Sequence, residues 1–315
     1  MNFQQLRIIR EAARREYNLT EVANALYTSQ SGVSRHIREL EDELGIELFV
    51  RHGKRLLGMT EPGKELLVIA ERMLNDANNI RKLAETFANR EHGRLHVTTT
   101  HTQARYALPR VVKEFRSQFP QVQLELHQGG PDEIVRLLQA GETDIGISSE
   151  RLDQADGIVA FPYYTWHHNI VVPAGHPLTQ QPELTLARLA EWPIITYQSG
   201  LTGRARVDEA FAAAGLQPEI LLTAQDSDVI KTYVELEMGV GILADMAFDA
   251  RRDTGLVQLD GSHLFAAHTA WIGLKRGQYQ HNFAWQFIQQ CNPQLALSDI
   301  QARVFGSEPM LDYEI

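Results

Sequence analysis

The sequence predicts an α+β protein in which a helical N-terminal third precedes a longer part where strands and helices alternate. Residues 1–60 contain short apolar repeats at helical spacing, followed by two apolar runs around a basic turn. Residues 61–90 hold one longer apolar repeat, and residues 91–315 alternate short apolar runs with amphipathic segments. With 315 residues, the chain is long enough for two or three compact units.

The chain is acidic, but its charge is unevenly divided. The formal net charge is −10, yet residues 1–90 hold 14 Lys and Arg against 13 Asp and Glu, whereas the remainder hold 16 against 27. Any contact with a polyanion must therefore come from local clusters of basic side chains. No apolar run of membrane-spanning length and no signal-peptide pattern is present, so we expect a cytoplasmic protein that does not enter a membrane.

Three helices are predicted in the first 45 residues. Apolar side chains at steps of three and four define the first helix: Phe3, Leu6, Ile9, Ala13 and Tyr17. The second helix, 19–26, begins after Asn18 as N-cap. The third begins after Ser29, ends near Gly45 and is expected to bury Val33, Ile37, Leu40 and Leu44. Two short helices joined by a tight turn are typical of a helix-turn-helix.

The start of the third helix carries polar side chains suited to DNA: Thr28, Ser29, Gln30, Ser31, Ser34, Arg35 and Arg38. Gln pairs with adenine and Arg with guanine in the major groove, while hydroxyls at a helix start suit phosphate. The alternative is the solvated face of an ordinary helical bundle.

A basic hairpin is predicted directly after this helix. Apolar runs at 46–50 and 56–57 flank a turn around Gly53, which carries the basic residues Arg51, Lys54 and Arg55. A hairpin of this kind forms a wing that reaches the DNA backbone or minor groove. Residues 1–60 are therefore predicted to form a winged helix-turn-helix. Residues 58–64 also match the start of a nucleotide P-loop, but Glu65 occupies the position that needs Ser or Thr.

Residues 61–90 are predicted to form a long linker helix. Apolar side chains repeat every seven residues: Leu66, Ala70, Met73, Ala77, Ile80, Ala84 and Phe87. Such a repeat favours pairing with the same helix of a second chain, which would present two recognition helices to two DNA half-sites. The alternative is a helix that lies on its own domain.

Residues 91–315 are predicted to form an α/β domain with a mostly parallel sheet and enough elements for two lobes. The predicted strands are 95–99, 122–126, 144–148, 194–197, 219–223, 239–243 and 269–274. The predicted helices are 107–119, 132–140, 203–214, 228–238 and 282–291. Ligands of such folds lie at the carboxyl ends of strands, where the polar loops 98–105, 199–204 and 225–228 are expected. With Arg105 and Arg204 nearby, the first two of these loops suit a small oxyanion, although N-capping alone would also explain their composition.

Metal binding and catalysis are not expected. His167 and His168 are adjacent and would point to opposite faces of a strand, while His96 and His101 lack a third partner at ligand spacing. Cys291 is the only cysteine and is predicted to be a buried structural thiol. No nucleophile elbow or dinucleotide-binding motif is present. We therefore expect neither an enzyme nor a cofactor, only a small-molecule effector.

The chain resembles the LysR-type transcriptional regulators, on the pattern Ala23-x-x-Leu26-x-x-Ser29-Gln30-Ser31-x-x-Ser34-x-x-Ile37-x-x-Leu40-Glu41. Within that family it is similar to the cysteine-regulon branch of CysB and Cbl, and most to Cbl-like members. The residues that carry this are 99–106, 202–204 and 226–233, together with 1–6, 166–168 and 273–277.

This resemblance implies a tetrameric regulator, usually an activator, of genes for sulfur assimilation or for sulfonates and other alternative sulfur sources. It implies promoter DNA, a second copy of the chain and RNA polymerase as partners. The effector domain would resemble periplasmic binding proteins, with lobe I at about 91–162 and 268–315 and lobe II at about 163–267. The effector would be a sulfate-like anion, adenosine phosphosulfate or acetylserine. Residues implied to contact it are Thr100, Thr102, Gln103, Ser149, Glu150, Trp166 and Thr202.

Three rival functions make different predictions. A secreted solute-binding protein predicts a signal peptide and no helix-turn-helix, whereas this sequence shows no signal-peptide pattern and does show a helix-turn-helix. A cytosolic enzyme predicts a convergent acid and base pair, which the sequence does not show. A ligand-blind repressor predicts no polar loops at the strand ends, where this chain has them.

Overall fold

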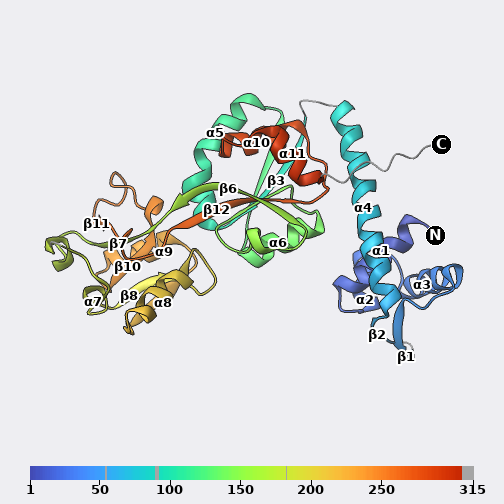
Figure 1. The fold of residues 1–315 in the computed structure, drawn as a ribbon, viewed down its shortest axis with the longest axis horizontal. Coiled ribbons are helices and arrows are strands. Elements are labelled where there is room, and N and C mark those ends of the chain that lie inside the picture. Colours follow the sequence, from blue (N-terminus) through green and yellow to red (C-terminus); the bar gives the residue numbers. More distant parts are fainter. Residues whose placement is uncertain (54, 89–91, 182, 307–315) are drawn as a thin grey trace. The chain divides into compact units, whose positions relative to one another are not determined.

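The computed structural model describes residues 1–53, 55–88, 92–181 and 183–306. The chain divides into two compact units, Met1–Glu85 and Thr86–Ile315 (Figure 1). None of the helices in the described ranges is long and apolar enough to cross a membrane. Lys54, one of the predicted DNA contacts, lies outside the described residues.

The N-terminal unit is a winged helix-turn-helix, as predicted. Its helices are α1 (Phe3–Arg14), α2 (Leu19–Ala25) and α3 (Gln30–Leu44). Strands β1 (Phe49–His52) and β2 (Arg55–Met59) pair antiparallel as the wing. Asn2, Asn18 and Ser29 cap the three helices with their side chains, and Gly45 ends α3 in the left-handed conformation. Local sequence therefore determines where each of these helices begins and ends.

Two details of the predicted helix faces are wrong. Helix α1 ends at Arg14, and its buried apolar residues are Leu6, Ile8, Ile9 and Ala12 rather than the set from Phe3 to Tyr17. Tyr17 follows the helix with a positive φ of 65° and packs edge-on against Phe49. Leu44 is exposed because the last turn of α3 extends beyond the core, in which Val33, Ile37 and Leu40 are buried.

Helix α4 (Glu61–Ala88) begins against the wing. A Cβ at Gly63 would lie 2.1 Å from the carbonyl oxygen of Leu48, so this glycine permits close backbone packing. Ala70 and Leu74 are buried with Leu6 of α1, while Ile80 is 69% exposed and Leu83 is 42% exposed. The first half of the predicted stripe therefore packs on its own domain, and the described large apolar residues of the second half remain on the surface.

The C-terminal unit contains two five-stranded sheets. The first sheet defines lobe I, with strands in the order β4 (Val122–Gln128), β3 (Gly93–Thr99), β5 (Ile145–Ser148), β12 (His268–Lys275) and β6 (Ile158–Trp166). Helices α5 (Leu108–Gln118), α10 (Asn282–Cys291) and α11 (Leu297–Phe305) contribute to the main core of this lobe, and α6 (Pro131–Ala140) to a second cluster. Cys291 is free and buried in the main core, as predicted.

The second sheet defines lobe II, with strands in the order β11 (Leu256–Leu259), β7 (His168–Pro173), β10 (Val240–Ala244), β8 (Ile194–Tyr197) and β9 (Ile220–Ala224). Helices α7 (Leu186–Leu189) and α8 (Arg204–Ala213) contribute to one core cluster of this lobe. Helix α9 (Ser227–Glu235) contributes to another.

The prediction of a mostly parallel sheet is wrong. In each sheet two strand pairs are parallel and two are antiparallel. The chain passes from lobe I to lobe II between β6 and β7, and it returns between β11 and β12. Strand β12 therefore runs against β5 and β6 in the first sheet, and β7 runs against β10 and β11 in the second. Strand β6 extends lobe I to Trp166, beyond the division predicted between residues 162 and 163.

Candidate functional site

The polar residues predicted to contact DNA lie on the exposed start of α3. Ser29 accepts a hydrogen bond from the Gly32 amide at 3.1 Å, which fixes the first turn. Gln30, Ser31, Arg35 and Arg38 are exposed, while Thr28 and Ser34 are partly buried. A surface hollow of about 480 Å³ is lined by Leu19, Gln30, Ser31, Ser34, Arg35, Arg38, Glu39 and Asp42. We call this set of residues the α3 face.

Gln30 lines both the hollow of the α3 face and a second hollow that reaches the wing. The second hollow, of about 390 Å³, is lined by Gln30 together with Arg55 of the wing and residues 16–20 before and within α2. Gln30 therefore stands between the basic residues of α3 and Arg55. This arrangement places donors for bases and donors for phosphates on one continuous surface.

Arg51 has a different role from Arg55. Its guanidinium forms an ion pair with Glu41, whose other carboxylate oxygen accepts the Leu48 amide at 2.9 Å and the Phe49 amide at 3.3 Å. These contacts fasten the first wing strand to α3. Arg51 is thus engaged in the fold, although its place in the hairpin sequence predicted a contact with DNA.

Tyr27 was not among the predicted DNA contacts. It stands in the turn between α2 and α3 with φ of 50° and is 98% exposed. An aromatic side chain this exposed gains nothing from burial in the core. Its position directly before Thr28 is the only signal in the sequence that could have identified it.

The residues predicted to bind an effector come from four segments that meet between lobes I and II. Thr100, Thr102 and Gln103 follow β3, Ser149 and Glu150 follow β5, Trp166 ends β6, and Thr202 follows β8. The hydroxyls of Thr102 and Thr202 lie 3.4 Å apart, although 100 residues separate them in the sequence. We call these seven residues the interlobe site.

Each remaining member of the interlobe site has a defined place. The Thr100 amide donates to the carbonyl of Ile147 at 3.3 Å, which holds the loop after β3 beside the end of β5. The Trp166 indole donates to the Ser149 hydroxyl at 3.0 Å. Gln103 accepts a hydrogen bond from Tyr164, which the sequence did not identify. Thr100, Thr102, Gln103, Trp166 and Thr202 are buried, and Ser149 and Glu150 are partly buried, so the seven form an organised polar cluster.

Glu150 is the one acidic member of the interlobe site. One carboxylate oxygen accepts the Gly203 amide of lobe II, and the other lies 3.5 Å from the Ser148 hydroxyl. Burial raises the pKa of Glu150 to about 7, against the opposing effect of the hydrogen bonds from Gly203 and Ser148. At neutral pH this carboxyl is therefore divided between its charged and neutral forms.

Two histidine rings lie beside Gly203, and Trp166 packs against both of them. His268 stacks on Trp166 with ring centroids 4.3 Å apart, and His168 meets both rings edge-on. Burial lowers the pKa of His168 to about 3 and that of His268 to about 4. A Cβ at Gly203 would lie 2.3 Å from the His268 ring, so residue 203 must be glycine for this packing. Both histidines are neutral at neutral pH.

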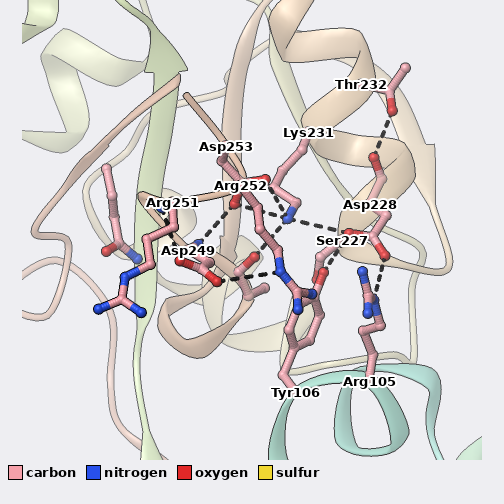
Figure 2. A network of polar contacts seen from close by, with 12 residues as sticks. Arg105, Tyr106, Ser227, Asp228, Lys231, Thr232, Asp249, Arg251, Arg252 and Asp253 are labelled. Atoms are coloured by element: carbon pink, nitrogen blue, oxygen red, sulfur yellow. Dashed lines mark hydrogen bonds and ion pairs between the residues drawn. The ribbon is translucent and has the colours of Figure 1, made fainter. Parts of the chain in front are cut away.

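A second polar network joins the lobes at another point. Figure 2 shows Arg105 and Tyr106 of lobe I reaching Asp228 at the start of α9, at 3.1 and 2.7 Å. The buried Lys231 lies 3.3 Å from Asp228 and donates to both carboxylate oxygens of Asp253 at 3.0 Å. Burial acts to raise the pKa of Asp228, but hydrogen bonds from Tyr106, Arg105 and Lys231 outweigh it and lower that pKa. We call this network the interlobe clasp.

Neither arginine expected near an oxyanion is available to one in this structure. Arg105 belongs to the interlobe clasp. Arg204 pairs with Asp208 at 2.8 Å and donates to the Tyr197 carbonyl at 2.7 Å. The interlobe site is thus built from hydroxyls, an amide, an indole and one carboxyl.

One group of residues has the composition of a metal site. Ligand atoms of His101, Asp226 and Asp228 lie within 4.8 Å of one another, so the structure supplies the partners that the sequence did not reveal for His101. Asp228 is already neutralised by Arg105 and Lys231, and Asp226 caps α9 through the Val229 amide. These carboxylates therefore have other partners in the fold.

Comparisons with known proteins agree with this architecture. Residues 3–64 match the model of the bacterial regulatory helix-turn-helix of the lysR family, and residues 88–296 match the LysR substrate binding domain. The chain belongs to the LysR family of transcriptional regulators. It is 61% identical to the HTH-type transcriptional regulator cbl of Escherichia coli (strain K12), with all of both chains covered. It is 55% identical to SsuR of Burkholderia cenocepacia, over 95% of this chain and 97% of the relative.

A solved structure of a relative supports the same assignment. The cofactor-binding domain of the Cbl transcriptional regulator is 54% identical to this LysR-family chain, with a TM-score of 0.67. The match covers 69% of this chain and 95% of that domain. The predicted family, its Cbl-like branch and the winged helix-turn-helix are thereby confirmed, as is the prediction that the chain is a DNA-binding regulator rather than an enzyme.

Proposed function

We propose that this regulator controls genes for sulfur assimilation or alternative sulfur sources such as sulfonates, chiefly as an activator. Its effector would be a sulfur-related small molecule at the interlobe site: a sulfate-like anion, adenosine phosphosulfate or acetylserine. The similarity to cbl and SsuR regulators supports the class of genes. The observation that carries the effector site is the convergence of Thr102 and Thr202 from opposite lobes at 3.4 Å.

The chemistry of the interlobe site suits an oxyanion held by neutral groups. Thr100, Thr102, Gln103, Ser149 and Thr202 provide hydroxyl and amide donors, and α8 begins beside Thr202. Backbone amides at a helix start and hydroxyls bind anions without a full positive charge. A ligand that inserts between Thr102 and Thr202 would exchange one interlobe contact for two contacts with itself. It would therefore favour one relative position of the lobes over another.

On DNA, we propose that the α3 face reads bases in the major groove while Arg55 and Lys54 of the wing contact the backbone. Thr28, Ser29 and Tyr27 would approach phosphates at the start of α3. Arg51 would act through the wing geometry, because Glu41 holds its guanidinium. As a regulator of promoter DNA, the chain would work in the cytoplasm and act on transcription through RNA polymerase.

We further propose that two chains pair through α4 and that pairs assemble into tetramers. Ile80 and Leu83 are exposed on α4 and continue the apolar stripe that is buried at Ala70 and Leu74. Their burial against a second copy would place two α3 faces over two half-sites.

Thermal unfolding with a ligand panel tests the effector proposal. A ligand present at about 100 times its dissociation constant should stabilise the domain that binds it by roughly 2.7 kcal/mol. The panel contains sulfate, thiosulfate, adenosine phosphosulfate and acetylserine. We expect one of them to raise the unfolding temperature of the wild-type protein, and Thr102→Ala to lose that increase while keeping its DNA affinity.

The matched control is Thr98→Ala. Thr98 is also buried in lobe I, but its hydroxyl donates to Thr143 at 3.0 Å within the same lobe. The control should unfold at a lower temperature yet keep the full ligand response. Equal loss of ligand response in both variants, or no response of the wild type to any member of the panel, would refute the proposed site.

A further inference from the structure

Glu150 joins the two lobes at the position where an oxyanion would be held. Its carboxyl accepts the Gly203 amide, and Gly203 directly follows Thr202, whose hydroxyl meets Thr102. The amide at the start of α8 is a donor that an anionic ligand would use. In this structure the Gly203 amide already donates its hydrogen bond to the Glu150 carboxyl.

No cation neutralises Glu150 within the described part of the chain. The basic residues on the elements around it have acidic partners of their own: Arg151 with Asp132 at 3.1 Å, Arg204 with Asp208 at 2.8 Å, and Arg206 with Glu209 at 3.6 Å. His101, on the loop after β3, lies with Asp226 and Asp228. A charged Glu150 would therefore be a partly buried anion without a cationic partner among the described residues, which is costly.

The histidines near Gly203 do not supply the missing charge. His268 and His168 approach this glycine, and burial lowers the pKa of both far below neutrality. Arg206 and, less strongly, His167 lower the pKa of His268 further, and neither is among the groups that shift the pKa of Glu150. Neutral rings cannot balance a carboxylate and an oxyanion held side by side.

Two negative charges that share a buried site raise each other's pKa, and the weaker acid takes up a proton. Sulfate and thiosulfate stay fully ionised at neutral pH, so the proton must go to the protein. The pKa of Glu150 already stands at about 7 before any ligand charge is added. A small further rise is enough to protonate it in the complex.

This inference rests on the proposed effector function. We propose that Glu150 determines which effector is accepted, because an oxyanion is held at the interlobe site only together with one proton on the Glu150 carboxyl. The proton comes from solvent, and the neutral carboxyl then has an O–H to donate to the anion. A ligand that carries an ammonium group would bind with Glu150 ionised and take up no proton. Glu150 thus separates the two classes of ligand by charge.

The sign of the pH dependence follows. Below about pH 7 the free protein already carries the proton, so the association constant of an oxyanion should change little with pH. Above about pH 7 the proton has to be taken up on binding, and the association constant should fall by up to about tenfold per pH unit. A zwitterionic ligand should show no such fall.

Calorimetric titration of the full-length protein with sulfate and with thiosulfate, from pH 6.5 to 8.5, tests this proposal. Titrations in two buffers of different ionisation enthalpy count the protons taken up. For the wild type we expect an uptake approaching one proton at about pH 8 and the affinity loss described above. Glu150→Gln, which keeps the shape but carries no charge, should bind with an affinity that is flat over this range. Glu219→Gln, at an exposed glutamate of lobe II, should behave as the wild type.

The outcomes separate this inference from the proposed function. Binding of an oxyanion without proton uptake, or proton uptake that persists in Glu150→Gln, would overturn the role of Glu150 and leave the effector site standing. No binding of either oxyanion at pH 6.5, where Glu150 is largely protonated, would overturn the oxyanion effector and this inference with it. The wild-type buffer comparison gives its answer even if Glu150→Gln folds poorly.

Discussion

The α3 face and the interlobe site are both polar clusters, but the protein holds them in opposite ways. Gln30, Ser31, Arg35 and Arg38 project from one helix into solvent and lie within nine residues of sequence. The interlobe site brings Thr102 and Thr202 together from opposite lobes and buries both. Side chains of the first kind can change without affecting the fold, whereas those of the second kind support the structure in which they act.

The same contrast applies to charged residues. Arg35 of the α3 face lies 3.5 Å from Glu39, and both side chains are largely exposed. Lys231 of the interlobe clasp is buried against Asp253, which is nearly as buried. Exposed ion pairs contribute little to stability, while removing one partner of a buried pair leaves an uncompensated charge.

The largest effect should come from breaking the interlobe clasp. Lys231→Met removes the charge that neutralises Asp253, and we expect the C-terminal unit to lose about 3–5 kcal/mol of unfolding free energy. Denaturant unfolding of the full chain measures it. Arg188→Met, which removes an exposed partner of Glu191, is the control and should cost below about 1 kcal/mol. Similar losses in the two variants would contradict the buried role assigned to Lys231.

An intermediate effect is expected at the α3 face. Gln30→Ala should weaken binding to DNA sequences selected by the wild-type protein by about 1–3 kcal/mol, because a specific base contact is lost. Its unfolding temperature should not change. Gln4→Ala, at an exposed glutamine of α1, serves as the control. Competition binding with selected and random DNA measures the specificity; if Gln30→Ala and Gln4→Ala bind alike, Gln30 does not read the DNA.

The smallest effect at neutral pH concerns the neutral histidines beside the interlobe site, whose contribution emerges only in acid. The pKa values of His168 and His268 lie below their ordinary value of 6.5, so the unfolded chain binds protons first as pH falls. Stability of the C-terminal unit should therefore decrease between about pH 6.5 and pH 4, while Glu150, with its raised pKa, opposes part of this decrease. His268→Gln should reduce the decrease by at most about 1.4 kcal/mol per pH unit. His52→Gln, in the exposed wing, should leave the profile unchanged, and an unchanged profile in His268→Gln would show that this histidine is not held neutral.

Sequence patterns predicted individual elements well where the determinants were local. The start of α3 at Gln30 followed from Ser29 as N-cap, and its end from Gly45. Strands β6, β7 and β11 were missed, although β6 is the longest strand described. Pro162 interrupts the apolar run of β6 and argues against a strand, but it lies near the bulge in the pairing of β6 with β12, where a proline is tolerated.

The direction of strand pairing was not predictable in the same way. Apolar runs such as 269–274 look alike whether their neighbours are parallel or antiparallel. Strand β12 pairs antiparallel with β5 and β6 because the chain returns to lobe I from lobe II at this point. The direction of β12 therefore depends on the path of the whole chain and cannot be predicted from the residues of the strand alone.

The sequence by itself determined the family, the order of the domains, the helix caps and the residues that α3 presents to solvent. Each of these depends on neighbours within a few positions, so the pattern contains the information. Only the tertiary structure decided that Arg51 supports the wing, that Arg105 and Arg204 have partners of their own, and that Glu150 lies partly buried with no cationic partner among the described residues. Hydrogen bonds, burial and pKa values depend on groups that are distant in sequence but meet in space, such as Glu150 and Gly203, 53 residues apart, or Arg105 and Asp228, 123 residues apart.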